Sequence, residues 1–384
     1  MTVLVSLTEF ILYTCFSVLI GALILLLVPE NKRPSLHIPR KVLFLVTGLI
    51  PLAALLPVIK TAEILSGSNG FWFVFKSVLF SFEVGKSWLF IALVATILIR
   101  VLLSKELKTN KNITIFALIL TALMLVGYTS SSHAATITEW QGFLYHTLHF
   151  LAVSIWIGLL LVVSWFAKNT DNWIAFLKWF TPVAIACLIV ALISGLFTMT
   201  IDINSYDDPA ASILKEYQNS LMFNYGQALL IKHVLIIALI IFALVNGILF
   251  RKRSKQPAFN PLKWARLESV FALIVFGVTA FMGQSWPPHE IFNLMKTHGA
   301  SPLFNAIYSG DIVSHIQNAT KETSALYHVT FSFGLESSLL FLLGLLFLVI
   351  TIFAAVKRQS IFVSAISSLL MVLALYIGIM VGIN

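Results

Sequence analysis

Residues 225–250 read YGQALLIKHVLIIALIIFALVNGILF, and this stretch decides the fold. Lys232 and His233 are its only basic side chains, and it holds no acidic residue. A run of this length matches the roughly 20 residues that a helix needs to cross the hydrocarbon core of a bilayer. Backbone polar groups find no water there, so only helices and closed barrels cross a membrane, and barrel strands are much shorter. We therefore predict a transmembrane α-helix.

Nine further apolar runs have a similar length. The ten predicted spans lie near residues 5–28, 41–62, 86–103, 112–129, 142–166, 176–200, 225–250, 266–284, 333–356 and 360–382. The composition agrees, because 59% of the residues are hydrophobic, 11% are charged and the mean hydropathy is +0.95. A soluble domain with a polar exterior is excluded. The predicted fold is all-α, a polytopic transmembrane helical bundle of about ten spans in the cytoplasmic (cell) membrane, with the membrane lipid as its surroundings.

Basic residues gather in every second loop. They follow the first, third, fifth, seventh and ninth spans and include Lys32, Arg33, Arg100, Lys105, Lys168, Arg251, Arg253 and Lys357. By the positive-inside rule these loops are cytoplasmic and both termini lie outside. The formal net charge of +9 then belongs mainly to cytoplasmic loops, and we expect no nucleic acid partner. We also expect the first span to be retained, because no cleavage pattern follows it.

Four regions organise the chain. We assign residues 1–130 to N-terminal transmembrane helices, 131–290 to a transmembrane core, 291–332 to an extracytoplasmic loop and 333–384 to C-terminal transmembrane helices. The extramembrane stretch begins at Ser285 and is predicted to be a lid or loop. The phenylalanine-rich stretch 70–83 is typical of a helix lying in the membrane interface.

Histidine is distributed unevenly across the predicted membrane. Only His37 falls on the cytoplasmic side, whereas the outer side holds His133, His146, His149, His233, His289, His298, His315 and His328. The thioethers of Met199, Met222, Met282 and Met295 join them. Imidazole binds many transition metals and thioether sulfur favours Cu(I), so this supply indicates metal handling at the outer face.

Two histidine groups flank the fourth and fifth spans. Residues 131–135, SSHAA, end the fourth predicted span, and residues 145–149, YHTLH, begin the fifth. His146 and His149 are three apart and share a helix face, so both can point at one ion. The alternative is an interfacial pair bonded to water, headgroups or carbonyl groups.

His233 lies inside the seventh span, where an ionisable group is costly unless it faces protein or water. It is either a deep metal ligand or a structural residue bonded to a neighbouring helix, with Lys232 extended towards the headgroups. After the eighth span, residues 286–290, WPPHE, place His289 near Met282. Tyr327, His328 and Glu336 at the head of the ninth span could form the opposite wall.

Signatures of catalysis are absent from the sequence. It contains no P-loop, dinucleotide-binding glycine fingerprint, H-E-x-x-H or G-x-S-x-G motif, so we expect no enzyme and no ATP-driven pump. Cys15 and Cys187 lie inside predicted spans without C-x-x-C spacing and are expected to be small core residues.

Several of these segments resemble the bacterial copper-resistance protein D (CopD) family. The similarity is carried by SSHAA at 131–135, by HTLHFLAVSIWIG at 146–158 and by the stretch 180–288, and it is clearest over roughly residues 130–290. The last stretch includes Ser194, Gly195, Leu196, Tyr225, Gly226, Gln227, Lys232, Asn246, Arg266, Glu268 and the Pro287-Pro288 pair. Only Gly158 stands where many relatives have two glycines, which bears on helix packing.

The resemblance implies an inner-membrane protein of copper uptake or tolerance and copper as the ion. It also implies a small CopC-type copper-binding partner at the outer face, which would be a separate chain because no β-rich domain is fused here. The leading hypothesis is a copper permease with an outer vestibule. Its first-choice metal ligands are His133, His149 and His289, and its second choices are His146, His233, His328 and Met282. Whether the ion is Cu(I) or Cu(II) stays open.

Two other functions remain compatible with the residues. In a b-type haem redox protein, His149 and His233 would be axial ligands, although an inner-side histidine pair for electron transfer across the membrane is missing. In a structural or assembly factor the histidines would be incidental. A visible absorption spectrum separates haem from copper, and elemental analysis separates both from the third possibility.

Overall fold

The computed structural model describes residues 2–204, 212–249, 260–308, 310–319, 328–357 and 360–384. Within these ranges ten helices are long and apolar enough to cross a membrane, which confirms the predicted helical bundle. They are α1 (Thr2–Leu27), α2 (Arg40–Ser66), α4 (Glu83–Leu102), α5 (Lys111–Thr129), α7 (Trp140–Phe166), α8 (Trp173–Ile203), α10 (Asn224–Leu244), α12 (Pro261–Gly283), α17 (Leu335–Lys357) and α18 (Ile361–Val381).

Short helices connect the long ones. They are α3 (Phe71–Ser81), α6 (His133–Thr138), α9 (Ile213–Ser220), α13 (Ile291–His298), α14 (Pro302–Ile307) and α15 (Ile312–Asn318). The phenylalanine-rich stretch 70–83 thus contains the helix α3, and the predicted lid or loop after Ser285 is partly helical. Three residues named in the sequence analysis lie outside the described residues: Arg251, Arg253 and Tyr327.

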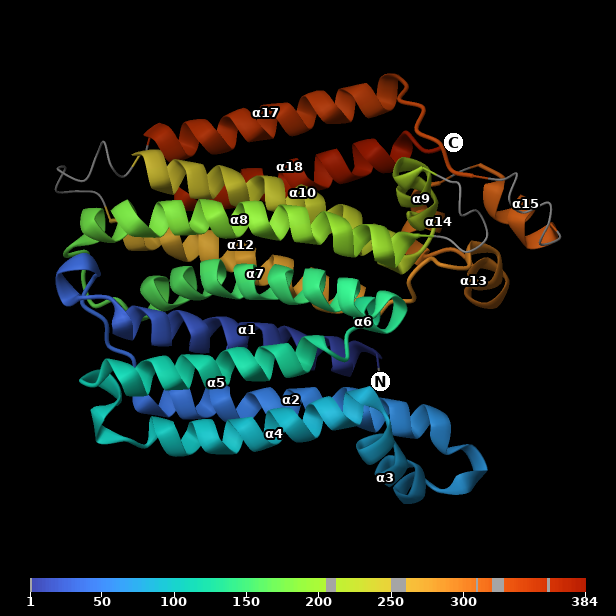
Figure 1. Ribbon diagram of the computed structural model, residues 1–384. Coiled ribbons are helices and arrows are strands. Elements are labelled where there is room, and N and C mark those ends of the chain that lie inside the picture. Colours follow the sequence, from blue (N-terminus) through green and yellow to red (C-terminus); the bar gives the residue numbers. More distant parts are fainter. Residues whose placement is uncertain (1, 205–211, 250–259, 309, 320–327, 358–359) are drawn as a thin grey trace. The chain divides into compact units, whose positions relative to one another are not determined.

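The chain forms two compact units. Unit 1 comprises Met1–Thr198 with Phe250–Ser269, and unit 2 comprises Met199–Leu249 with Val270–Asn384. In unit 1, α1, α2, α4, α5 and α7 run side by side (Figure 1), with α1 between α2 and α7 and with α4 against α2 and α5. The core of this unit is aliphatic and aromatic, with Phe16, Leu19 and Leu23 fully buried.

Glycine brings α1 and α7 into backbone contact. A Cβ atom on Gly21 would lie 2.2 Å from the carbonyl carbon of Gly158, and one on Gly158 would lie 2.0 Å from the Ser17 carbonyl oxygen. Small residues at such crossings let membrane helices gain dispersion contacts that larger side chains would prevent. Gly158 therefore fixes how closely the first and fifth spans approach.

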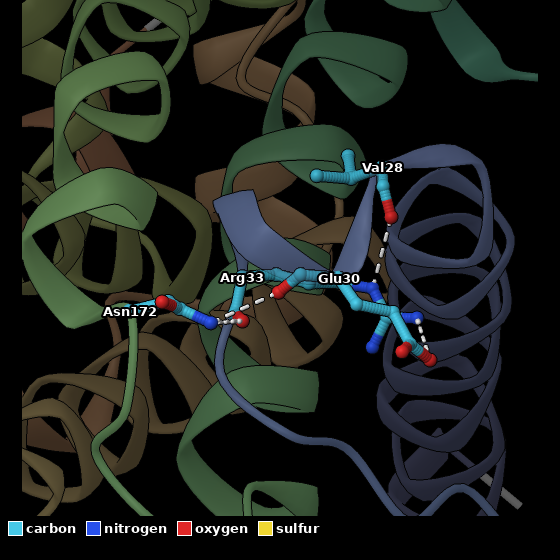
Figure 2. Close-up of polar contacts among 4 residues, drawn as sticks. All are labelled: Val28, Glu30, Arg33 and Asn172. Carbon is cyan, nitrogen blue, oxygen red and sulfur yellow. Dashed lines mark hydrogen bonds and ion pairs between the residues drawn. The ribbon is translucent and has the colours of Figure 1, made fainter.

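The loops after the first and fifth spans meet at one end of unit 1. The Asn172 side chain donates to the carbonyl oxygens of Glu30 (3.1 Å) and Arg33 (3.5 Å), and the Arg33 guanidinium donates to the Val28 carbonyl at 3.0 Å (Figure 2). Arg40, at the start of α2, donates to the Lys105 carbonyl in the loop after the third span. Three of the basic loops therefore lie at the same end, as their charge pattern predicts.

Unit 2 is built around α10, α17 and α18. Helix α18 packs against both α17 and α10. Gln227 of α10 is buried and bonds with Tyr376 of α18 and with the Leu221 carbonyl. Backbone groups of Thr330 and Asn384 bond in both directions at 2.9 Å, so the segment before α17 lies beside the residues after α18. This end of unit 2 also holds α9 and α14, which contact α10.

Candidate metal centre

Histidine and acid groups alone do not form a metal site here. Among the described residues, no group of three or more His, Cys, Asp or Glu side chains is placed to hold a metal ion. The two cysteines are free thiols, with Cys15 buried and Cys187 half-buried. A metal centre in the described part of the chain therefore needs another ligand type, and methionine is the one with suitable chemistry.

Two methionines, Met199 and Met282, belong to one apolar cluster of unit 2, which we call the methionine cluster. Its buried members are Ile203, Tyr225, Ala228, Leu229 and Met282, and Met199, Tyr217 and Val278 pack against it. They come from the end of α8, the start of α10, the end of α12 and the short helix α9. Met282 is 9% exposed. The fold thus brings two thioethers from distant parts of the sequence into one apolar surrounding.

Polar groups border the methionine cluster on the α8 side. The Tyr225 hydroxyl donates to Asp202 Oδ2 at 3.0 Å, so a cluster residue fixes the carboxylate of the last turn of α8. The Lys232 ammonium interacts electrostatically with the same carboxylate. A carboxylate bonded to a residue of the methionine cluster adds a negative charge that a metal cation would find favourable.

His233 is joined to the cluster through Tyr217. The Tyr217 hydroxyl lies 3.1 Å from His233 Nδ1, and the two rings stack with their centroids 5.8 Å apart. Burial raises the pKa of the Tyr217 hydroxyl well above its usual value, so this group remains neutral at physiological pH. His233 thereby has a neutral partner and lies about two helical turns beyond Tyr225 along α10.

His289 has an orientation that suits metal binding. Its side chain is buried, and its Nδ1 lies 2.9 Å from the carbonyl oxygen of Asn204, which follows α8. A carbonyl oxygen only accepts, so Nδ1 is the donor in this bond. Histidines that ligate metals commonly donate their other ring N–H in this way.

His149 has the same tautomer in unit 1. Its Nδ1 donates to the Ala191 carbonyl of α8 at 2.8 Å, which turns the ring towards α8. Gly195 leaves room for it, because a Cβ atom there would lie 2.9 Å from His149 Cε1 and Nδ1. His146 precedes it by less than one turn of α7 and is half-buried.

His133 is exposed and does not close the fourth span. Helix α5 ends at Thr129, and His133 begins the separate helix α6, where the Ser132 hydroxyl accepts from the Ala135 amide. Serine is a preferred N-cap residue, which explains the new helix start. Together with His146 and His149, it lies at the end of unit 1 opposite the basic loops.

The remaining predicted residues have varied surroundings. His298 and His315 are exposed, and His298 stacks on Trp286 with ring centroids 5.6 Å apart. His328 is half-buried, Glu336 is exposed in the first turn of α17, and Met222 and Met295 are buried outside the methionine cluster. Three residues that the sequence analysis did not single out are central to polar contacts: Tyr217, Glu9 and Tyr13.

Comparison with known proteins gives the family. Residues 174–282 match the family model for copper resistance protein D, and residues 1–143 match the model for the N-terminal domain of copper resistance protein D-like proteins. The two matches together take in about two thirds of the chain. The chain belongs to the copper resistance protein D family. The searches of curated proteins and of solved structures give no match.

CopD membership confirms the resemblance that the sequence indicates and extends it to the N-terminal half. With ten membrane-capable helices among its described residues, this is a multi-pass protein of the cytoplasmic membrane, and its family relates it to copper transport. The matched region 174–282 contains Met199, Asp202, Tyr225, His233 and Met282, whereas His289 lies just beyond it.

Proposed function

We propose that this CopD-family protein binds Cu(I) at the methionine cluster of unit 2 and moves it across the membrane. In this proposal Met199 and Met282 are the ligands, and the Asp202 carboxylate supplies negative charge. His289 binds the ion before it reaches the thioethers, and His233 binds it afterwards. The single observation that carries it is the packing of Met199 and Met282 on one buried cluster. Thioethers favour Cu(I) over harder divalent ions.

The order of these groups supports movement along α10. Met282, Asp202 and Tyr225 lie in the last or first turns of their helices, whereas His233 is the tenth residue of α10. At 1.5 Å per residue, His233 lies about 12 Å further along the helix than Tyr225. Asn204 connects His289 to the end of α8, two residues after Asp202. Groups at successive depths are what stepwise passage of an ion requires.

The outer face completes the proposal. His133 and His149 of unit 1 are proposed to capture copper delivered by a separate CopC-type donor, and His328 is a further candidate at that face. The metal-binding tautomer of His149 supports its part. The direction of movement is inward if the basic loops are cytoplasmic.

Cu(I) affinity tests the methionine cluster. The full-length protein is purified in detergent, and its affinity is measured under ascorbate by competition with a chromophoric Cu(I) chelator. Leucine preserves volume and apolarity but removes the sulfur ligand. We expect Met199→Leu and Met282→Leu each to weaken Cu(I) binding by about tenfold or more. Met295→Leu is the control, because Met295 is also a buried methionine but lies outside the cluster.

Two results would overturn the proposal. The first is unchanged Cu(I) affinity in both Met199→Leu and Met282→Leu. The second is a Soret band in the purified protein that disappears in His149→Ala or His233→Ala, which would establish the haem alternative. We expect a colourless protein that retains copper.

A further inference from the structure

Unit 1 contains a buried carboxyl group that the copper proposal does not use. Glu9 is 9% exposed and is the eighth residue of α1, so it lies about 10 Å from the start of that helix. An ionisable residue at this depth in a span is costly to maintain and is a functional candidate by default. Its neighbours indicate which ligand it could take.

Two tyrosines surround the Glu9 carboxyl. The Tyr13 hydroxyl donates to Glu9 Oε2 at 3.2 Å. Tyr128 of α5 interacts with Glu9, and its ring centroid is 6.4 Å from that of Tyr13. Phe16 and Phe150 pack edge-on in the same group, with ring centroids 5.6 Å apart. Two neutral phenols and aromatic rings surround this carboxyl. They offer few oxygen or sulfur ligands to a metal ion, so the ligand that suits the Glu9 carboxyl is a proton.

The register of α1 and α7 brings a histidine to the level of Glu9. The two helices are parallel neighbours, Gly21 meets Gly158, and Tyr13 meets Phe150 with ring centroids 5.4 Å apart. Both pairs have the same offset in sequence. One turn earlier, the same offset pairs Glu9 with His146. Glu9 and Tyr13 are four residues apart on α1, and His146 and Phe150 are four residues apart on α7. Residues with this spacing lie along one ridge of a helix.

The helices packed against α1 carry titratable or charged groups near this level. Tyr128 of α5 interacts with Glu9, and the helix register places His146 of α7 one turn before Phe150, which packs on Tyr13. Helix α2 is antiparallel to α1, and Lys60 lies six residues before its end at Ser66, about 9 Å in. Carboxyl, imidazole and amine can exchange a proton without any other reactant.

We propose that Glu9 and His146, together with Tyr13 and Tyr128, form a proton-binding site in unit 1, and that this proton is the coupling ion for copper movement. The coupling part rests on the proposed function, whereas proton binding does not. The step is a transfer of one proton from the Glu9 carboxyl oxygen to an imidazole nitrogen of His146, and no other bond changes. In this proposal His146 binds the proton and is not a copper ligand.

Infrared spectroscopy of the copper-free, full-length protein tests proton binding directly. A protonated carboxyl gives a C=O stretching band that disappears on ionisation. We expect a band that titrates with pH in the unmodified protein and is missing in Glu9→Gln. Glu83→Gln is the matched control, because Glu83 is exposed at the same end of unit 1 and its loss should leave the titrating band intact. Tyr13→Phe should shift the band, since it removes the hydroxyl that bonds to Glu9.

Copper uptake into proteoliposomes tests the coupling. We expect uptake to vary with external pH in the unmodified protein and in Glu83→Gln but to lose that variation in Glu9→Gln, with Cu(I) affinity unchanged in all three. A band that is identical in Glu9→Gln and the unmodified protein, or an unchanged pH dependence of uptake in Glu9→Gln, would overturn the inference. Absence of uptake by the unmodified protein at every pH would contradict the coupling and the proposed function, while the infrared titration would still decide proton binding.

Discussion

His149 keeps its orientation because residue 195 of the neighbouring helix has no side chain. The imidazole is held by one hydrogen bond to the Ala191 carbonyl, and the backbone of Gly195 forms the surface beside it. The family resemblance includes Gly195, yet the sequence alone does not say why glycine is needed. Its partner lies far away in the sequence and no local periodicity connects them, so only the packed structure supplies the reason.

Replacing Gly195 with alanine should therefore displace His149. The new methyl group would need the space that Cε1 and Nδ1 occupy, and the bond to Ala191 would break. We expect a loss of about 1–2 kcal/mol in stability, from overpacking and the lost hydrogen bond. Thermal unfolding in detergent measures it, and ¹⁵N NMR of the imidazole reports the tautomer. Gly48→Ala is the control, since nothing lies within 4 Å of a Cβ there. Equal effects of both substitutions would refute the explanation.

The crossing of α1 and α7 is a close helix contact in unit 1 that glycine makes possible. Composition and the lengths of the apolar runs predict that both helices exist, because crossing a membrane imposes a length and an apolar character on each one. They do not predict which spans are neighbours, since lipid-facing and buried residues are equally apolar. The sequence does not predict the proposed Glu9 site for the same reason: its members come from three helices that only packing brings together.

Gly158→Ala tests the crossing. A methyl group would meet the Ser17 carbonyl oxygen at 2.0 Å, so the helices would have to separate over several turns. We expect a destabilisation of about 3 kcal/mol, at the upper end for overpacking because the obstacle is backbone. Gly277→Ala, in α12, has open space around its Cβ and should leave the melting temperature unchanged. If Gly158→Ala and Gly277→Ala have the same melting temperature, the contact at Gly158 does not hold α1 and α7 together.

At the scale of the whole molecule, the alternation of basic loops is the strongest indication in the sequence of how the spans are oriented. It predicts correctly that the loops after the first, third and fifth spans share one end of unit 1, because each span reverses the chain direction. The connecting helices were harder to foresee. Ser301 followed by Pro302 is a typical helix start, and Ser301 does cap α14, but α13 and α15 begin without a side-chain cap.

Cysteine labelling tests the orientation. In a background with Cys15 and Cys187 replaced by alanine, we expect Ser314→Cys to react with a membrane-impermeant thiol reagent in intact cells. Ser35→Cys should react only after the membrane is permeabilised, because it lies in a basic loop. Both side chains are exposed, so accessibility to the reagent depends on the side of the membrane. The reverse pattern would place the histidines in the cytoplasm and reverse the proposed direction of copper movement.

The pairing of α1 with α7 also has a consequence for biosynthesis. Gly21 is translated long before Gly158, and at 5–20 residues per second the delay is about 7 to 27 seconds. During that interval the glycine-lined side of α1 and the Glu9 carboxyl face lipid or the insertion machinery instead of their final neighbour. The arrival of the fifth span ends that exposure, so the side of α1 that carries Gly21 becomes covered only after four spans have been inserted.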